Sequence, residues 1–137
     1  MRALLFNAKE YGVKFVSLAN KPEGIIPEEI KGKEEQECEN CVVAFITIEQ
    51  GDDEEKAKGM AKEIKKMCNE VKRDNAVIVP FAHLSNNLGD PKISLQLFKI
   101  IEKELKGIKF ISTHFGSNKS LHLDIYGHQG NARYREF

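Results

Sequence analysis

The stretch Ala76-Val77-Ile78-Val79-Pro80-Phe81-Ala82-His83-Leu84-Ser85 decides the fold. Its first four residues are wholly apolar, which is typical of a short buried strand. A helix signal follows, because Asp90 can cap a helix, Pro91 suits the first helical position, and apolar residues then recur at helical spacing. His83 therefore lies where a buried strand ends and the chain turns toward a helix. In sheets with parallel strands, ligands tend to bind at such points.

A lone histidine in a turn more often makes a local hydrogen bond than binds a ligand. A second unusual stretch, Phe115-Gly116-Ser117-Asn118-Lys119, favours the ligand-binding hypothesis. If the strands before the two stretches lie side by side, His83 and Lys119 line one cleft. A lysine in a partly apolar cleft can hold an anionic group or stabilise developing negative charge. The plainer alternatives are a solvated Lys119 and a tight turn at Gly116.

Composition indicates a single globular domain over residues 1–137, with 41% hydrophobic and 31% charged residues. The 21 lysines and arginines balance 21 aspartates and glutamates, so net charge gives no argument for nucleic acid. Any RNA contact would need a local basic patch. No apolar run approaches the roughly 18 residues of a membrane-spanning helix, and the start is too short for a signal peptide. We therefore expect a soluble, cytoplasmic protein.

Three cysteines, an odd number, fit a reducing compartment better than a disulfide framework. Cys38-Glu39-Asn40-Cys41 has the spacing of half a zinc site, but no second half follows it. Cys68 lies among the apolar positions of an expected helix. We therefore expect no metal and no cofactor.

Apolar periodicity predicts the remaining elements. A first long helix is expected to open at residues 51–53 and to carry its apolar face as far as residue 71, and a second is expected from about residue 91 to residue 106. A turn at 9–12 separates the first two strands, residues 20–40 form a long surface connection with one helical turn near 27–30, and residues 127–137 form a tail or loop. Strands are expected over residues 2–8, 13–19, 41–49, 76–79, 109–113 and 120–126.

The expected order is β-β-β-α-β-α-β-β. Strands joined through helices imply parallel pairing, and hairpins at both ends imply antiparallel pairing. The sequence therefore predicts the α/β class, with a mixed β-sheet and two helices packed on one face.

The quoted residues resemble a known family, the N-terminal editing domain of archaeal threonyl-tRNA synthetases, which has the fold of D-aminoacyl-tRNA deacylases. The resemblance covers most of the chain and is strongest at residues 80–85. It also includes the stretches at residues 1–5, 43–49, 115–119 and 127–128, and the order of the elements.

The resemblance implies hydrolysis of the ester that joins a wrong amino acid, chiefly L-serine, to the threonine tRNA. Serine lacks one methyl group of threonine, and such a group is worth only about 1–3 kcal/mol in a pocket, too little for faithful translation. Lys119 matches the lysine that positions the attacking water and the substrate. His83 matches a motif histidine that holds the site's geometry or the terminal adenosine, and the terminal ribose hydroxyl of the tRNA assists. Substrate-binding positions transferred to this chain are Thr47, Ile48, Pro80, Phe81, Ala82, Phe115, Gly116 and Asn118.

The resemblance also implies partners. These are the 3′ end of the threonine tRNA carrying serine, the synthetase catalytic domain in cis or in trans, and a second copy in a homodimer.

Two alternative functions stay open. Asn7-Ala8-Lys9 replaces the family's usual His-Ser-Asp, Asn118 replaces an aromatic residue, and Ala132 replaces an acidic residue. These differences favour a catalytically degenerate module that binds tRNA or a partner domain. The third hypothesis is a free-standing D-aminoacyl-tRNA deacylase, since backbone-lined pockets of this fold discriminate chirality.

Overall fold

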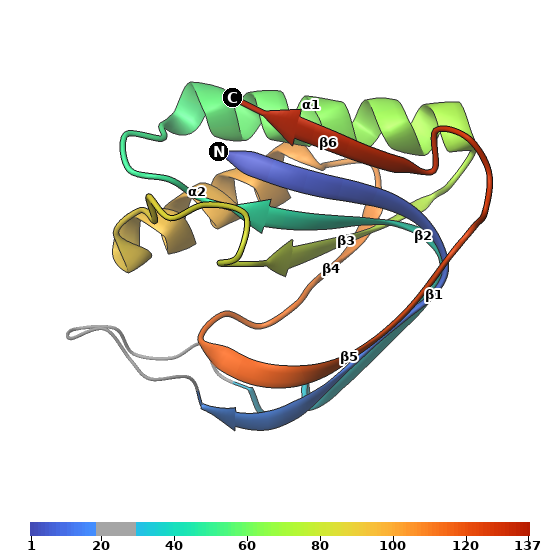
Figure 1. Ribbon diagram of the computed structural model, residues 1–137, viewed down its shortest axis with the longest axis horizontal. Helices are drawn as coiled ribbons and strands as arrows, with labels where there is room; N and C mark the ends of the chain where they lie inside the picture. Colours follow the sequence, from blue (N-terminus) through green and yellow to red (C-terminus); the bar gives the residue numbers. More distant parts are fainter. Residues whose placement is uncertain (19–29) are drawn as a thin grey trace.

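A computed structural model describes residues 1–18 and 30–137. Within these residues the chain forms one sheet of six strands and two helices (Figure 1). The helices are α1 (Glu54–Val71) and α2 (Pro91–Glu104). The strands are β1 (Arg2–Leu18), β2 (Glu35–Thr47), β3 (Asn75–Pro80), β4 (Lys109–Ser112), β5 (Ser117–Ile125) and β6 (Ala132–Glu136).

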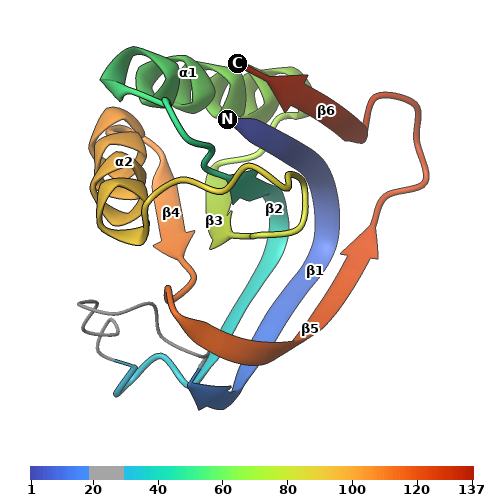
Figure 2. The same cartoon turned by 60° about the vertical axis from the view of Figure 1, so that its left-hand side comes forward.

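The sheet is mixed and has the order β4-β3-β2-β1-β5, with β6 paired to β1. β3 pairs in parallel with both β2 and β4, whereas β1 pairs antiparallel with β2, β5 and β6. Both helices pack on the same side of the sheet (Figure 2). The predicted fold class, a mixed sheet with two helices on one face, is confirmed.

The turn predicted at residues 9–12 is wrong, because β1 runs through it without a break. The β1–β2 ladder pairs Ala8 with Cys41 and Glu10 with Glu39, but skips Lys9 and Asn40. Asn40 has a positive φ of 49°. The two strands bend together (Figure 1), so the polar signal at residue 9 marks a bulge-like irregularity and not a hairpin.

The tail predicted at residues 127–137 is also wrong, because it contains β6. Arg2 pairs with Glu136 and Phe6 with Ala132. The sequence Ala-Arg-Tyr-Arg-Glu hides this strand, since its alternate residues are arginines that pair with carboxylates on α1 rather than apolar residues. With one strand fewer before α1 and one more at the end, the observed order is β-β-α-β-α-β-β-β.

Other boundaries shift by a few residues. β2 begins at Glu35, inside the predicted connection. The sequence did not reveal this start, because five of the first six residues of β2 are charged or polar. β5 begins at Ser117, three residues before the predicted start. The helical turn predicted near residues 27–30 falls on residues that lie outside the described part of the chain, except for residue 30.

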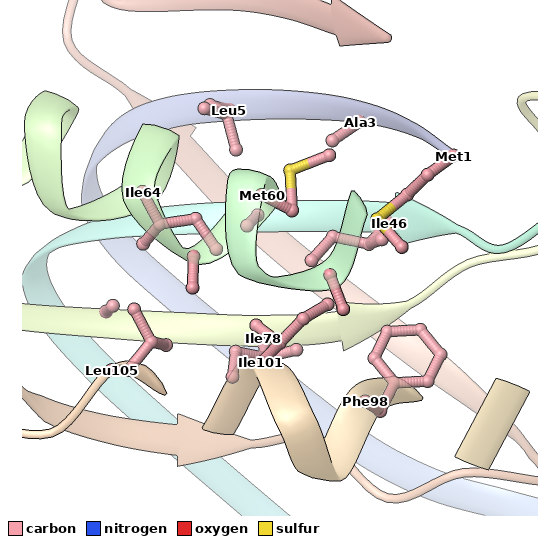
Figure 3. Close-up of a cluster of buried hydrophobic side chains, with 14 of the residues drawn as sticks. Met1, Ala3, Leu5, Ile46, Met60, Ile64, Ile78, Phe98, Ile101 and Leu105 are labelled. Carbon is pink, nitrogen blue, oxygen red and sulfur yellow. The ribbon is translucent and has the colours of Figure 1, made fainter. Parts of the chain in front are cut away.

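The main core lies between the two helices and one face of the sheet (Figure 3). Asp53 caps the start of α1, because its side chain accepts a hydrogen bond from the Lys56 amide. Its buried residues recur every three or four positions, as in an amphipathic helix. Core side chains in Figure 3 include Ala3, Leu5, Ile46, Met60, Ile64, Ile78, Phe98, Ile101 and Leu105.

A second apolar cluster lies on the opposite face of β2 and β3. It includes Val43, Phe45 and Val77, and the Tyr11 hydroxyl lies 2.6 Å from the Thr113 hydroxyl beside it. Because both faces of β2 are covered, residues 41–48 are buried without interruption.

Asn7 joins three parts of the chain where β1 changes partner from β6 to β5. Its amide donates to the Asn131 carbonyl at 2.8 Å, and its carbonyl accepts from the Tyr126 amide at 3.0 Å. Its side-chain Oδ1 accepts from Arg73 Nε at 3.0 Å, and its Nδ2 donates to Asn131 Oδ1 at 3.0 Å. This buried network closes the connection between β5 and β6.

We expect Asn7→Ala to lower the free energy of unfolding by about 2–3 kcal/mol, because one buried and one part-buried side-chain hydrogen bond are lost and the Asn131 side chain stays buried. Urea denaturation followed by circular dichroism measures the change. Gln96→Ala, exposed on α2, is the control and should change stability by less than about 0.5 kcal/mol. Equal effects of the two substitutions would contradict the role of Asn7.

Candidate functional site

A small cavity lies at the carboxyl ends of the parallel strands β2 and β3, which end side by side (Figure 1). Its volume is about 170 Å³, and its walls are mostly apolar. The lining residues are Ile46, Thr47, Ile48, Pro80, Phe81, Ala82, Leu88, Gly89, Pro91, Ser94, Phe98 and Phe115.

Thr47 attaches the first wall of the cavity to the sheet. The Phe81 amide donates to the Ile46 carbonyl at 2.9 Å, which continues the parallel ladder past the end of β3. The buried Thr47 hydroxyl donates to the Phe81 carbonyl and accepts from the Leu84 amide. The turn that carries His83 is therefore held at both its start and its middle by one side chain.

The second wall comes from the start of α2. Gly89 donates its amide to the Ile48 carbonyl at 3.0 Å, and a Cβ atom there would lie only 3.1 Å from the Glu49 carbonyl oxygen. This close approach favours glycine, because a side chain would force the neighbouring backbone to shift. Asp90 then caps the helix by accepting hydrogen bonds from the Lys92 and Ile93 amides. The helix presents Ser94 and Phe98 to the cavity.

The third wall is Phe115, from the connection between β4 and β5. Its ring centroid lies 6.1 Å from that of Phe98. The preceding residue, His114, is fully buried, hydrogen-bonds through Nδ1 to the Ser117 hydroxyl, and meets the Phe15 ring edge-on. Gly116 follows with a φ of 83°, which allows the sharp change of direction into β5.

The structure brings six of the ten predicted site residues together. Thr47, Ile48, Pro80, Phe81, Ala82 and Phe115 all line the cavity. His83, Gly116, Asn118 and Lys119 do not line it.

Sequence reasoning missed the wall formed by Leu88, Gly89, Ser94 and Phe98. The helix signal at Asp90 and Pro91 was visible in the sequence. That signal could not show that the first two turns of α2 face the ends of β2 and β3, because the orientation depends on how the helix packs.

Lys119 lies in β5 opposite Phe15, and its Nζ donates to the Ser117 carbonyl at 3.0 Å. Its side chain is half-buried, and burial lowers its pKa below the ordinary value of a lysine. It is therefore not the ordinary solvated lysine of the plainer alternative. The neighbouring Asn118 is exposed and donates through Nδ2 to the Ser17 hydroxyl at 3.2 Å.

His83 is exposed, and its ring packs edge-on against Phe81 with centroids 4.9 Å apart. It lines an open, polar hollow of about 550 Å³ next to the cavity. Arg2, Glu49 and the residues from Leu84 to Asn87 form the rest of this hollow.

Glu49 anchors the turn that carries His83. Its Oε2 accepts a hydrogen bond from the Ser85 hydroxyl at 2.7 Å and lies 3.2 Å from Arg2 Nε. Its Oε1 lies 3.0 Å from the Met1 ammonium group. The Ser85 hydrogen bond, followed by the Met1 ammonium and Arg2, lowers the pKa of Glu49 to about 2. The carboxylate is therefore held ionised beside the hollow.

The described residues contain no group of three or more histidine, cysteine, aspartate or glutamate side chains arranged to hold a metal ion. None of their helices is long and apolar enough to cross a membrane.

Comparison with known proteins decides the family. The family model described as the archaea-specific editing domain of threonyl-tRNA synthetase matches residues 1–136. The chain belongs to this family. Its role is therefore that of an editing domain in the proofreading of threonine-tRNA synthesis.

Curated relatives agree with this family. The chain is 34% identical to a threonine–tRNA ligase of Staphylothermus marinus, over 93% of this chain and 21% of that protein. It is 36% identical to a threonine–tRNA ligase editing subunit of Saccharolobus solfataricus, over 90% of this chain and 29% of that protein. The chain thus spans less than a third of the length of these relatives.

A solved structure named c-Myc DNA Unwinding Element Binding Protein has the same fold. It matches with a TM-score of 0.68 and 11% identity, over 100% of this chain and 99% of that one. At such low identity the likeness shows the fold alone.

Thr47→Val removes the hydroxyl but keeps the shape of the side chain, so the Phe81 carbonyl and Leu84 amide lose their shared partner. We expect the free energy of unfolding to fall by about 1–3 kcal/mol and the Leu84 amide to exchange with deuterium faster. Hydrogen exchange read by nuclear magnetic resonance measures the second effect. Thr47→Ser keeps the hydroxyl and should keep Leu84 protected; unchanged exchange in Thr47→Val would disprove this bridge.

The lowered pKa of Glu49 gives its contribution a defined pH dependence. The contribution is fully present above the ordinary value of 4.5 and is lost as the pH falls toward about 2. Glutamine is neutral at every pH and lacks the ion pairs of the Glu49 carboxylate. The melting temperature of Glu49→Gln should therefore lie below that of the wild type at neutral pH. The two should converge in acid, where Glu49 is protonated. Melting temperatures across this range test this, with Glu55→Gln on α1 as the control. A constant difference between wild type and Glu49→Gln would rule out the assignment.

Proposed function

We propose that this domain hydrolyses the ester bond of L-seryl-tRNA for threonine. The observation that carries the proposal is the small apolar cavity at the ends of β2 and β3, where two stretches far apart in the sequence meet at Phe81 and Phe115. This is the place where ligands bind in sheets with parallel strands.

The size of the cavity supports an aminoacyl group as its occupant. At about 170 Å³ it is smaller than the roughly 300–1,000 Å³ of pockets that hold drug-sized ligands. A serine side chain and its ester group suit such a volume, whereas a nucleotide does not. The terminal adenosine would then lie outside, in the polar hollow lined by Arg2 and His83.

Lys119 is proposed as the main catalytic residue. Water adds to the ester carbonyl carbon, negative charge develops on the carbonyl oxygen, the bond to the ribose oxygen breaks, and that oxygen takes up a proton. An ammonium group that is partly removed from water stabilises such developing charge more strongly than a solvated one. The terminal ribose hydroxyl of the tRNA assists, so the protein need not supply a strong base.

His83 is proposed to hold the geometry of the site or the terminal adenosine. Its ring already packs on Phe81, which lines the cavity, and the hollow that it lines is mostly polar. Gly116, a proposed substrate contact, follows Phe115 in the connection between β4 and β5, and Asn118, another, lies at the start of β5.

The proposed partners are the threonine tRNA and the catalytic part of a threonyl-tRNA synthetase, in cis or in trans. A homodimer and a cytoplasmic location belong to the same proposal. They rest on the family and on the relatives, of which this chain spans only a part.

We expect Lys119→Met to lower kcat/KM for L-seryl-tRNA deacylation by about 10²–10³-fold, since the charge that stabilises the transition state is lost. The lowered pKa of Lys119 means that its ammonium form destabilises the folded state, so the melting temperature should stay equal or rise. Release of labelled serine from the tRNA and thermal denaturation measure the two effects. Lys99→Met, exposed on α2, is the matched control and should keep the wild-type rate.

The same assay separates the alternative functions. Faster release from D-seryl-tRNA than from L-seryl-tRNA would favour a D-aminoacyl-tRNA deacylase. Measurable tRNA binding without hydrolysis of any mischarged tRNA would favour the degenerate module. A wild-type rate in Lys119→Met would remove Lys119 from the mechanism.

A further inference from the structure

Two cysteine side chains meet at the bend of the sheet, away from the cavity. Cys38 and Cys41 lie in β2, separated by Glu39 and Asn40. In a regular strand, residues three positions apart point to opposite faces. Here the ladder skips Asn40, which has a positive φ, and both cysteines belong to the same apolar cluster. The bend therefore places the two thiols on one face.

The two thiols differ in access. Cys41 is 0% exposed, whereas Cys38 is half-buried and lines an open hollow of about 500 Å³. A reagent can therefore reach Cys38 first, and Cys41 only through Cys38. The titratable groups that line the hollow with Cys38 are Glu10, Tyr11, Lys14, Glu37, Glu39 and His122.

The two thiols also differ in acidity. A hydrogen bond with Cys41 is the main reason that the pKa of Cys38 falls to about 7, although burial and Glu39 act in the opposite direction. The same hydrogen bond, followed by burial, raises the pKa of Cys41, and Arg73 only partly offsets this. Of the two thiols, Cys38 is therefore the one that ionises first, and Cys41 stays a thiol.

We propose that Cys38 is a reactive thiol and Cys41 its resolving partner, so that a low-molecular-weight disulfide oxidises the pair to an intramolecular disulfide. The Cys38 thiolate attacks one sulfur of the reagent, a mixed disulfide forms, and one thiolate leaves. Cys41 then attacks the Cys38 sulfur, and its proton goes to the second thiolate as that group leaves. Two thiols of the protein are oxidised and one reagent disulfide is reduced to two thiols.

Cys68 is the internal control. It is buried in α1, packs in the main core between the helices and the sheet, and has a pKa raised to about 11 by burial. A buried, neutral thiol of this kind should stay inert under conditions that modify Cys38.

Alkylation with iodoacetamide, followed by peptide mass spectrometry, tests the first half of the proposal on the folded 137-residue chain. The pH profile of Cys38 alkylation should have its midpoint near 7. At neutral pH the folded chain should react at Cys38 about threefold faster than the chain unfolded in guanidinium, since the larger thiolate fraction outweighs its lower nucleophilicity. A midpoint at or above the ordinary value of a free cysteine would overturn the proposal.

Oxidation with glutathione disulfide tests the second half. The wild type should end with a Cys38–Cys41 disulfide and no bound glutathione, and Cys68→Ser should behave identically. Cys41→Ser should stop at glutathione bound to Cys38, and Cys38→Ser should bind none. Glutathione retained on wild-type Cys38, a disulfide that includes Cys68, or no reaction would each overturn it. Circular dichroism confirms that each variant is folded, and Cys41→Ala replaces Cys41→Ser if that variant is not.

Discussion

The joint bend of β1 and β2 at Lys9 and Asn40 is the constraint on which the rest of the structure depends. Before it, β1 lies beside β6 and packs under the helices; after it, β1 lies beside β5. The bent half brings Tyr11 to Thr113 and Phe15 to His114. Those contacts position Phe115 against Phe98, so a distortion far from the cavity supplies one of its walls.

The turn after β3 and the Lys119 side chain are held in opposite ways. The turn after β3 is held firmly, by the Thr47 hydroxyl on one side and by Glu49 on the other. Lys119 is instead kept partly out of water, where its charged form is disfavoured. A partly desolvated cation is stabilised most when an anion or a developing negative charge comes near it.

An element of the fold could be predicted from the sequence where its residues form a recognisable local pattern. Buried strands such as Ala76–Val79 and helices with capping residues leave strong local patterns, and these were predicted closely. β6 has arginines where a buried strand has apolar residues, so it looked like a tail. Lys9–Gly12 looked like a turn, because a bulge and a turn both interrupt the period of two. The wall formed by Ser94 and Phe98 depends on helix packing, which no local pattern encodes.

The sequence by itself determined the α/β class, the two helices, the family resemblance and the two stretches that form opposite walls of the cavity. Only the tertiary structure decided that β1 is one bent strand with two successive partners, that Lys119 and His83 lie outside the cavity lining, and that Cys38 and Cys41 share a face. The physical reason is the distance along the sequence over which each interaction acts. Periodicity and capping act over a few residues, whereas strand pairing, burial and the pKa of a side chain depend on residues brought together from distant parts of the chain.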